Sequence, residues 1–162
     1  MTDDVTIRAA AGSDLDALAE LAGSRDRAEV RLQAAARGDD SMLVAVTAGV
    51  VVGVNSVRWR DGCDPPHPWL YGLAVDASHR RRGIGTELVR AAETMSSERD
   101  AGTVSLDVDV DDPAAIAFYE QLGYVIARAH EHRWRAIDPR TGAVTGEGIV
   151  PTWIMRRPLD QR

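Results

Sequence analysis

The stretch that decides the fold runs from Leu70 to Tyr124, and its centre, residues 74–85, reads AVDASHRRRGIG. A β-branched segment ends here, three arginines follow, and two glycines open an amphipathic segment. Glycine lets an anion approach the backbone, and the free N–H groups and dipole at a helix start attract negative charge. The stretch therefore predicts a site for a diphosphate-bearing ligand.

Other kinds of phosphate loop fit this stretch less well. A Walker loop needs lysine, and all nineteen basic residues of the chain are arginine. A dinucleotide fingerprint needs a third glycine where Leu88 stands, normally within a βαβ repeat of a longer chain. A tight turn with solvated arginines is the plainer alternative.

The neighbouring segments alternate between strand and helix patterns. Trp69–Val75 predicts a strand, and a helix follows over residues 84–97 with an apolar stripe at Ile84, Leu88, Ala92 and Met95. Residues 103–110 alternate as a strand. Asp112 and Pro113 then read as the N-cap and first residue of a helix that Gly123 ends.

The flanking segments complete one sheet. Before the decisive stretch we expect a strand at 6–9, a helix capped by Ser13, a helix over 24–37 and a hairpin of 42–46 with 50–59. A proline-rich loop spans 60–68, and 124–135 with 148–157 form a final antiparallel pair. The order predicts an α+β fold: a single mixed, mostly antiparallel sheet flanked by helices on both faces.

Composition sets further bounds. The chain has 162 residues, 44% hydrophobic and 27% charged, which fits one domain over residues 1–162. A net charge of −6 argues against nucleic acid as partner and favours a cationic small substrate. No apolar run is long enough for a membrane span and no secretory signal is visible, so a cytoplasmic location is expected.

Two motifs resemble those of the GNAT N-acetyltransferase superfamily. Residues 80–85, RRRGIG, resemble the R/Q-x-x-G-x-G/A loop that grips the pyrophosphate of acetyl-coenzyme A (acetyl-CoA), and residues 112–124, DPAAIAFYEQLGY, resemble the signature N-x-x-A-x-x-x-Y-E-K-L-G-F. The element order extends the resemblance over residues 6–157. It implies a GNAT-like fold and direct transfer of an acetyl group from acetyl-CoA to a primary amine.

The resemblance also implies roles for particular residues. The backbone of Leu73, Ala74 and Val75 would hold the pantetheine arm and the thioester oxygen. Tyr119 matches the tyrosine that protonates the departing thiolate. Asp112 stands where the family has asparagine, which puts its contact with the arm in doubt and leaves a helix cap as the simplest interpretation. The pyrophosphate would lie on the loop and helix start, made by Arg80, Arg81, Arg82, Gly83, Ile84, Gly85 and Thr86.

The general base is less well determined. An ammonium group with a pKa near 10 is only about 0.1% neutral at pH 7, so a group that removes its proton is expected. The strand before the loop holds no carboxylate, and Tyr71 is its polar candidate. Asp107 and Asp109 share one face of the next strand, and Asp107 is our candidate for base or water-positioning residue, whereas Asp109 at a strand end would be solvated.

We expect no metal. His130 and His132 could face one side of a strand as a ligand pair, but the sequence indicates no third ligand, so an exposed polar face is the simpler interpretation. Cys63, the only cysteine, excludes a disulfide framework. Because direct transfer needs no covalent enzyme intermediate, Cys63 is interpreted as incidental.

Three hypotheses remain open. The first is an N-acetyltransferase acting on a small-molecule or peptide amine. The second is a non-catalytic acyl-CoA-binding or sensing module on the same fold, and the third is a phosphate-binding domain unrelated to coenzyme A. Edge strands near the C-terminus would suit a homodimer.

Overall fold

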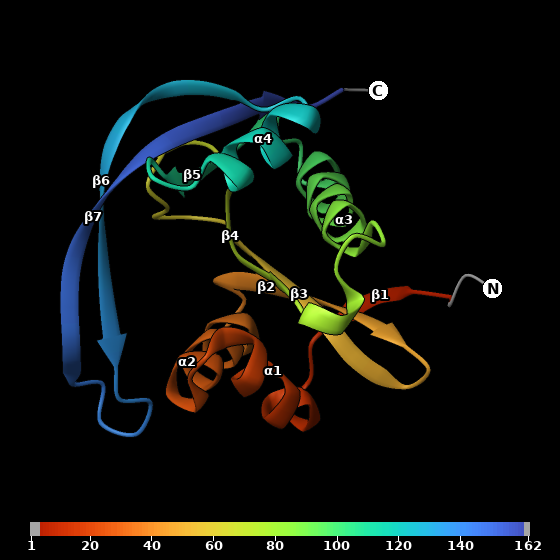
Figure 1. The fold of residues 1–162 in the computed structure, drawn as a ribbon. Coiled ribbons are helices and arrows are strands. Elements are labelled where there is room, and N and C mark those ends of the chain that lie inside the picture. The colour runs from red at the N-terminus through yellow and green to blue at the C-terminus, as the bar shows by residue number, and fades with distance from the viewer. Residues whose placement is uncertain (1–3, 161–162) are drawn as a thin grey trace.

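One seven-stranded sheet organises the chain (Figure 1). The computed structural model describes residues 4–160 and places the strands in the order β1-β2-β3-β4-β5-β7-β6. Neighbouring strands are antiparallel except β4 and β5, which are parallel. The mixed, mostly antiparallel sheet predicted from the sequence is confirmed. The strands are β1 Thr6–Ala9, β2 Asp40–Thr47, β3 Val50–Arg58, β4 Trp69–Val75, β5 Thr103–Asp109, β6 Val125–Ile137 and β7 Val144–Pro158.

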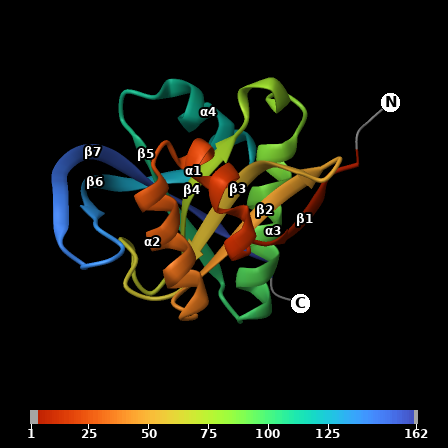
Figure 2. The same ribbon diagram turned by 90° about the horizontal axis from the view of Figure 1, so that it is seen from below.

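Helices cover both faces of the sheet, as the views in Figures 1 and 2 show. On one face, α1 (Leu15–Ala22) and α2 (Arg25–Ala36) bury Leu18 and Ala28 against β2 and β3. On the other face, α3 (Ile84–Glu98) buries the predicted stripe of Ile84, Leu88 and Ala92, and α4 (Pro113–Gln121) lies beside it. Short 3-10 turns, η1 Gly12–Asp14 and η2 Ala77–His79, precede α1 and α3.

The cap predicted for one helix is found in the structure, and the cap predicted for another is not. Asp112 caps α4 as predicted, with its Oδ1 accepting a hydrogen bond from the Ala115 amide at 3.0 Å. Ser24 caps α2 in the same way through the Arg27 amide, at 3.2 Å. The prediction that Ser13 caps α1 is wrong. Ser13 lies inside η1, and the buried Asp14 instead accepts from the Ala11 amide at 2.8 Å while it pairs with Arg8.

Strands β4 and β5 separate soon after they begin. The only residues paired between them are Trp69 and Ser105, near their start. In β4, Gly72 and Leu73 lie opposite the single residue Asn55 of β3, which makes a β-bulge. Gly72 adopts a φ of +71°, a conformation that glycine tolerates and other residues rarely adopt. Beyond Trp69 and through the bulge β4 has no pairing with β5, which leaves an opening in the middle of the sheet.

The last two strands form an arm that is longer than predicted. We expected strands over 124–135 and 148–157, but pairing continues outward to Ile137 and Val144. Most side chains of this outer half are exposed, so burial does not mark it in the sequence. The arm curves round toward α2, where Gln33 Nε2 donates to the Pro139 carbonyl at 3.3 Å (Figure 1).

Buried ion pairs fix the loop before β4 and the helix α3. Asp64 in the proline-rich loop accepts two hydrogen bonds from Arg156, at 2.7 and 2.8 Å, and one from Arg128, at 3.3 Å. On α3, the buried Glu93 accepts from the Tyr124 hydroxyl at 2.8 Å and pairs with Arg157. No helix within residues 4–160 is long and apolar enough to cross a bilayer.

The Asp64 ion pairs make a testable contribution to stability. Hydrogen bonds from Arg156 lower the pKa of Asp64 from 3.8 to about 2. A depressed carboxyl pKa stabilises the fold above the unfolded value and less so as pH falls toward 2. We expect Asp64→Asn to lower the free energy of unfolding at pH 7 by about 1–3 kcal/mol, with the difference shrinking between pH 4 and pH 2.

Urea denaturation at pH 7, 4 and 2.5 measures this effect. The control Asp39→Asn removes a carboxylate from an exposed pair with Arg37 and should change stability by less than about 0.5 kcal/mol. A difference between Asp64→Asn and the unsubstituted chain that stays constant from pH 7 to pH 2.5 would contradict the assignment.

Candidate active site

The opening between β4 and β5 continues into a cavity of about 790 Å³, here called the β4–α3–α4 cavity. Its wall combines the end of β4, the loop before α3, the start of α3 and one side of α4. Every predicted cofactor residue except Arg82 lines it. The lining residues are Leu73, Ala74, Val75, His79, Arg80, Arg81, Gly83, Ile84, Gly85, Thr86, Asp112, Ala114, Ala115, Phe118 and Tyr119.

One end of this cavity is rich in hydrogen-bond donors. Gly83 caps α3 with a φ of +80°, which turns the loop so that the helix starts at the cavity wall. Within residues 4–160, no atom accepts a hydrogen bond from the amides of Ile84, Gly85 or Thr86. Arg80 Nε donates to the Val75 carbonyl at 3.2 Å, which holds the loop against the end of β4. Free amides, a helix dipole and arginine charge together suit a phosphate group.

Tyr119 closes the other side of the cavity from α4. Its ring makes edge-to-face contacts with Phe118 and Tyr124, with centroid distances of 5.0 and 5.6 Å. Burial, and then the charge of Asp107, raise the pKa of the Tyr119 phenol above its usual value. The phenol is therefore protonated at neutral pH. Its hydroxyl has no hydrogen-bond partner in the described part of the chain, so the proton is available to a ligand.

Asp107 lies beside His132, a residue far from it in the sequence. Its Oδ2 is 2.9 Å from Nδ1 of His132 on the arm, but the angle is outside hydrogen-bond range, so the contact is an ion pair. Asp107 and then Cys63 raise the pKa of His132 to about 10, against the effect of burial. His132 is thus an imidazolium ion at neutral pH, and Asp107 is its carboxylate partner.

The other two candidates for the base are engaged elsewhere. Asp109 is exposed at the end of β5, and its Oδ1 accepts from the Asp111 amide at 2.8 Å, as expected for a solvated strand end. The Tyr71 hydroxyl donates to Asp40, and burial and this bond raise the pKa of Tyr71 to about 12. Each of these two groups therefore already has a hydrogen-bond partner within the protein.

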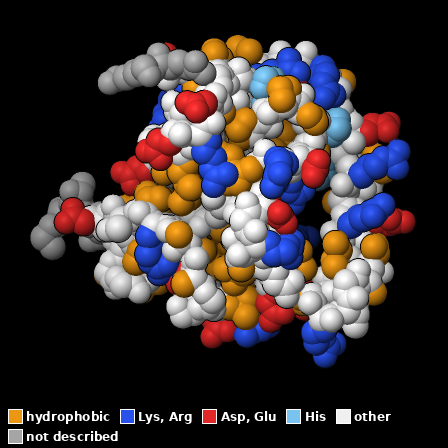
Figure 3. All heavy atoms as spheres, turned by 180° about the vertical axis from the view of Figure 1, so that it is seen from behind, with side chains coloured by type: hydrophobic (Ala, Val, Ile, Leu, Met, Phe, Trp, Pro, Cys, Tyr) orange, Lys and Arg blue, Asp and Glu red, His pale blue; other side chains and the backbone are white. Residues whose placement is uncertain are grey.

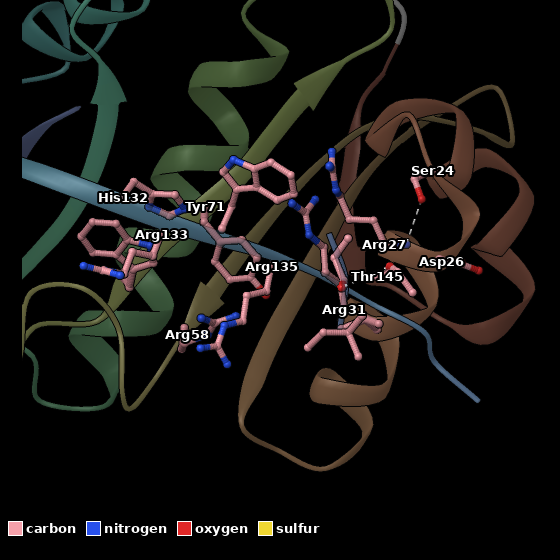
Figure 4. Close-up of a pocket in the computed structure, with 15 residues that line it drawn as sticks. Ser24, Asp26, Arg27, Arg31, Arg58, Tyr71, His132, Arg133, Arg135 and Thr145 are labelled. Atoms are coloured by element: carbon pink, nitrogen blue, oxygen red, sulfur yellow. Dashed lines mark hydrogen bonds between the residues drawn. The ribbon is translucent and has the colours of Figure 1, made fainter. Parts of the chain in front are cut away.

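A second cavity, of about 530 Å³, lies between α2, β4 and the arm, and is here called the α2–arm cavity. Figure 3 shows arginine side chains near the opening between the arm and the body, and Figure 4 shows the residues of the lining. The cavity reaches Trp69 and Tyr71, the residues of β4 just before the bulge, and His132 forms part of its wall. The two cavities therefore meet β4 on either side of Gly72.

The structure supplies a third potential ligand near the two histidines. Ligand atoms of Cys63, His130 and His132 all lie within 4.8 Å of one another. The sequence could not show this, because Cys63 belongs to the proline-rich loop and reaches the arm through tertiary contacts. Metal binding would require His132 in its neutral form, whereas Asp107 favours the imidazolium. That the chain uses no metal stays a prediction.

Comparison with known proteins places this arrangement in a family. The model of the Acetyltransferase (GNAT) family matches residues 13–124. The "N-alpha-acetyltransferase 30" of Xenopus laevis is 43% identical over 53 residues, which are 33% of this chain and 19% of that protein. The chain thus spans about a fifth of that relative's length.

Solved structures share the fold over nearly the whole chain. The ribosomal-protein-S18-alanine N-acetyltransferase from Escherichia coli is 20% identical, with a TM-score of 0.73 covering 98% of this chain and 96% of that one. A putative acetyltransferase from Salmonella typhimurium, solved with its cofactor acetyl-CoA, is 18% identical, with a TM-score of 0.71 covering 98% and 95%.

The ion pair at His132 gives a direct spectroscopic prediction. Replacing Asp107 by asparagine removes the largest cause of the raised pKa, so the His132 pKa should fall from about 10 toward the ordinary value near 6.5. In the unsubstituted chain, the pair stabilises the fold fully below about pH 6.5 and ceases to do so as pH rises through about 10.

An NMR titration of the imidazole ring protons measures the pKa directly. Asp109→Asn, which alters the next carboxylate on the same face of β5, is the matched control and should leave the His132 titration in place. An unshifted His132 pKa in Asp107→Asn would show that the two side chains do not pair in solution.

Proposed function

The chain belongs to the GNAT acetyltransferase family, and from that membership we propose that it transfers the acetyl group of acetyl-CoA directly to a primary amine. The observation that carries the proposal is the β4–α3–α4 cavity. It joins free amides at the start of α3 to the phenol of Tyr119 across the unpaired end of β4. Amides that suit a phosphate group and a protonated phenol thus line one cavity.

In this proposal the backbone of the chain holds the cosubstrate. The amides of residues 81–86, with the charges of Arg80, Arg81 and Arg82, bind the pyrophosphate. Leu73, Ala74 and Val75 face the opening on the side where β5 has left β4, so their backbone groups can pair with the pantetheine arm. A β4 amide near Val75 stabilises the oxyanion that forms when the amine attacks the thioester. Asp112 contributes chiefly as the cap of α4.

The chemical step needs one proton donor and one acceptor. The amine nitrogen forms a bond to the thioester carbon, the carbon–sulfur bond breaks, and Tyr119 gives its proton to the departing thiolate. Since a phenol near pKa 10 is a weaker acid than a thiol near 8.5, this transfer is uphill by about 1.5 pKa units, or about 2 kcal/mol, before burial adds to it. That is a small part of a typical barrier.

Asp107 is the acceptor of the ammonium proton in this mechanism, directly or through a water molecule. It stands on β5, two residues after Ser105, which pairs with Trp69 of β4, and its charge acts on both Tyr119 and His132. The imidazolium of His132 orients the carboxylate. A carboxylate on β5 takes the place of the one that β4 lacks. The missing β4 carboxylate, together with Asp112 in place of asparagine, favours the alternative of a non-catalytic acyl-CoA-binding module, and turnover with an amine would exclude that alternative.

The role of Tyr119 is tested by Tyr119→Phe. Loss of a general acid costs about 10²–10⁴-fold in rate, so we expect kcat to fall by at least about 100-fold. The dissociation constant of acetyl-CoA should change by less than about threefold, because the phenol does not hold the pyrophosphate. Thiol release with a panel of amines measures kcat, and calorimetry measures binding.

Tyr124→Phe is the matched control. Its hydroxyl is bonded to Glu93 and lies outside the cavity lining, so this variant should lose stability but retain kcat at temperatures where it is folded. Normal turnover in Tyr119→Phe would refute the acid role. A lack of heat on adding acetyl-CoA to the unsubstituted chain would refute the proposed function as a whole.

A further inference from the structure

The α2–arm cavity carries an unusual concentration of positive charge for an acidic chain. Among its lining residues Asp26 is the only carboxylate, while five are arginines. The arginines come from three separate elements, so the concentration does not follow from one basic segment of sequence (Figure 4). They are Arg27 and Arg31 of α2, Arg58 of β3, and Arg133 and Arg135 of the arm.

Few of these charges are neutralised by the protein. Arg58 lies 3.6 Å from Asp40, and Arg135 lies 3.9 Å from Glu147 in an exposed pair. Within residues 4–160, Arg31 and Arg133 have no carboxylate within ion-pair distance. Burial lowers the pKa of Arg31, which still carries its charge at neutral pH. A concave surface with unpaired arginines attracts and binds anions.

Arg31 holds its charge close to the reaction centre. Its guanidinium lies 5.2 Å from the centre of the Tyr71 ring, which fixes the side chain by a cation–π contact. The Arg31 guanidinium also packs against Gly72, the first residue of the bulge. A Cβ on Gly72 would come within 2.8 Å of Arg31 Nη1, so glycine is needed there for this approach as well as for its φ. Residues 73–75, which face the thioester in the proposed function, begin one residue further along β4.

The distance between Arg31 and residues 73–75 limits the size of an acceptor that can contact both. A strand advances about 3.3 Å per residue, so Gly72, against which the guanidinium packs, lies about 3–10 Å along the strand from the backbone of residues 73–75. An anionic group held by Arg31 would therefore lie only a few bonds from a nitrogen that attacks the thioester. The cavity, of about 530 Å³, suits a small molecule.

We propose that the acetyl acceptor is a small amine that carries a carboxylate or phosphate group within a few bonds of its nitrogen, and that Arg31 and Arg133 bind this group. The inference rests on the proposed function. It differs from the expectation of a cationic acceptor, which used the net charge of the whole chain. The charge of the cavity lining is the quantity that acts on a bound acceptor, and it has the opposite sign.

Matched pairs of amines test the proposal. We would compare kcat/KM for O-phosphoethanolamine with ethanolamine, and for glycine with glycinamide, with spermidine as the cationic probe. Values are expressed per concentration of free base, so that differences in amine pKa do not enter. We expect the anionic member of at least one pair to exceed its neutral partner and spermidine by about tenfold or more, and its KM to rise with salt.

Substitutions of Arg31 and Arg133 test whether these residues cause the preference for anionic amines. Arg31→Gln and Arg133→Gln should each lower kcat/KM for the preferred anionic amine by about tenfold and change that of its neutral partner by less than threefold. Arg133 is exposed on the arm, so its replacement keeps the test valid if Arg31→Gln does not fold. The control is Arg37→Gln, at the end of α2 and outside the cavity lining, which should leave both values unchanged.

The outcomes separate this proposal from the proposed function. Turnover that is equal for both members of each pair, or highest with spermidine, overturns the anionic acceptor and leaves the acetyltransferase in place. If acetyl-CoA binds but no amine reacts, calorimetric binding of O-phosphoethanolamine to the coenzyme A complex decides: binding that Arg31→Gln abolishes supports the proposal, and no binding overturns it. No heat with acetyl-CoA overturns both.

Discussion

The single pairing between β4 and β5 is the constraint on which the rest of the structure depends. Because the strands share only the Trp69–Ser105 pair, the backbone of the later part of β4 has no strand partner on that side. Backbone amides and carbonyls need partners when they are buried, so this edge favours a ligand with polar groups of its own. The bulge at Gly72 lies at the start of this edge, and its glycine also admits the guanidinium of Arg31 to the same point.

Buried carboxylates hold the loop before β4, the arm and α3 in place around this opening. Asp64 ties the loop before β4 to both strands of the arm, and Glu93 ties α3 to Tyr124 and Arg157. In each case an arginine is paired within the framework, and a lone substitution would leave a charge unpaired in a buried place. The arginines of the α2–arm cavity are of another kind, since the framework leaves most of their charge uncompensated. The same residue type thus serves stability in one place and, in our proposal, recognition in the other.

The sequence predicted those features that depend on nearby residues. Asp112 with Pro113 marks the start of α4, and the apolar stripe of α3 follows from its periodicity. It could not predict the outer half of the arm, whose strands pair with each other while their side chains stay exposed. The same limit applies to the contact of Asp107 with His132. These residues are on strands separated by β7, and they meet only because the arm curves back over the sheet.

There is a physical reason why the sequence predicts the proposed phosphate-binding part of the site but not the proposed acceptor-binding part. In our proposal, phosphate recognition at α3 uses backbone amides, and the sequence needs only glycines and a helix start to expose them, so a short motif is enough to predict it. In our proposal, acceptor recognition uses side chains that converge from α2, β3 and the arm, and no segment of the chain holds more than a part of them. The net charge of the chain is a sum over all its residues, so it does not show that the α2–arm cavity is positively charged. For an acceptor, the relevant charge is that of the cavity lining, and only the folded arrangement of the arginines supplies it.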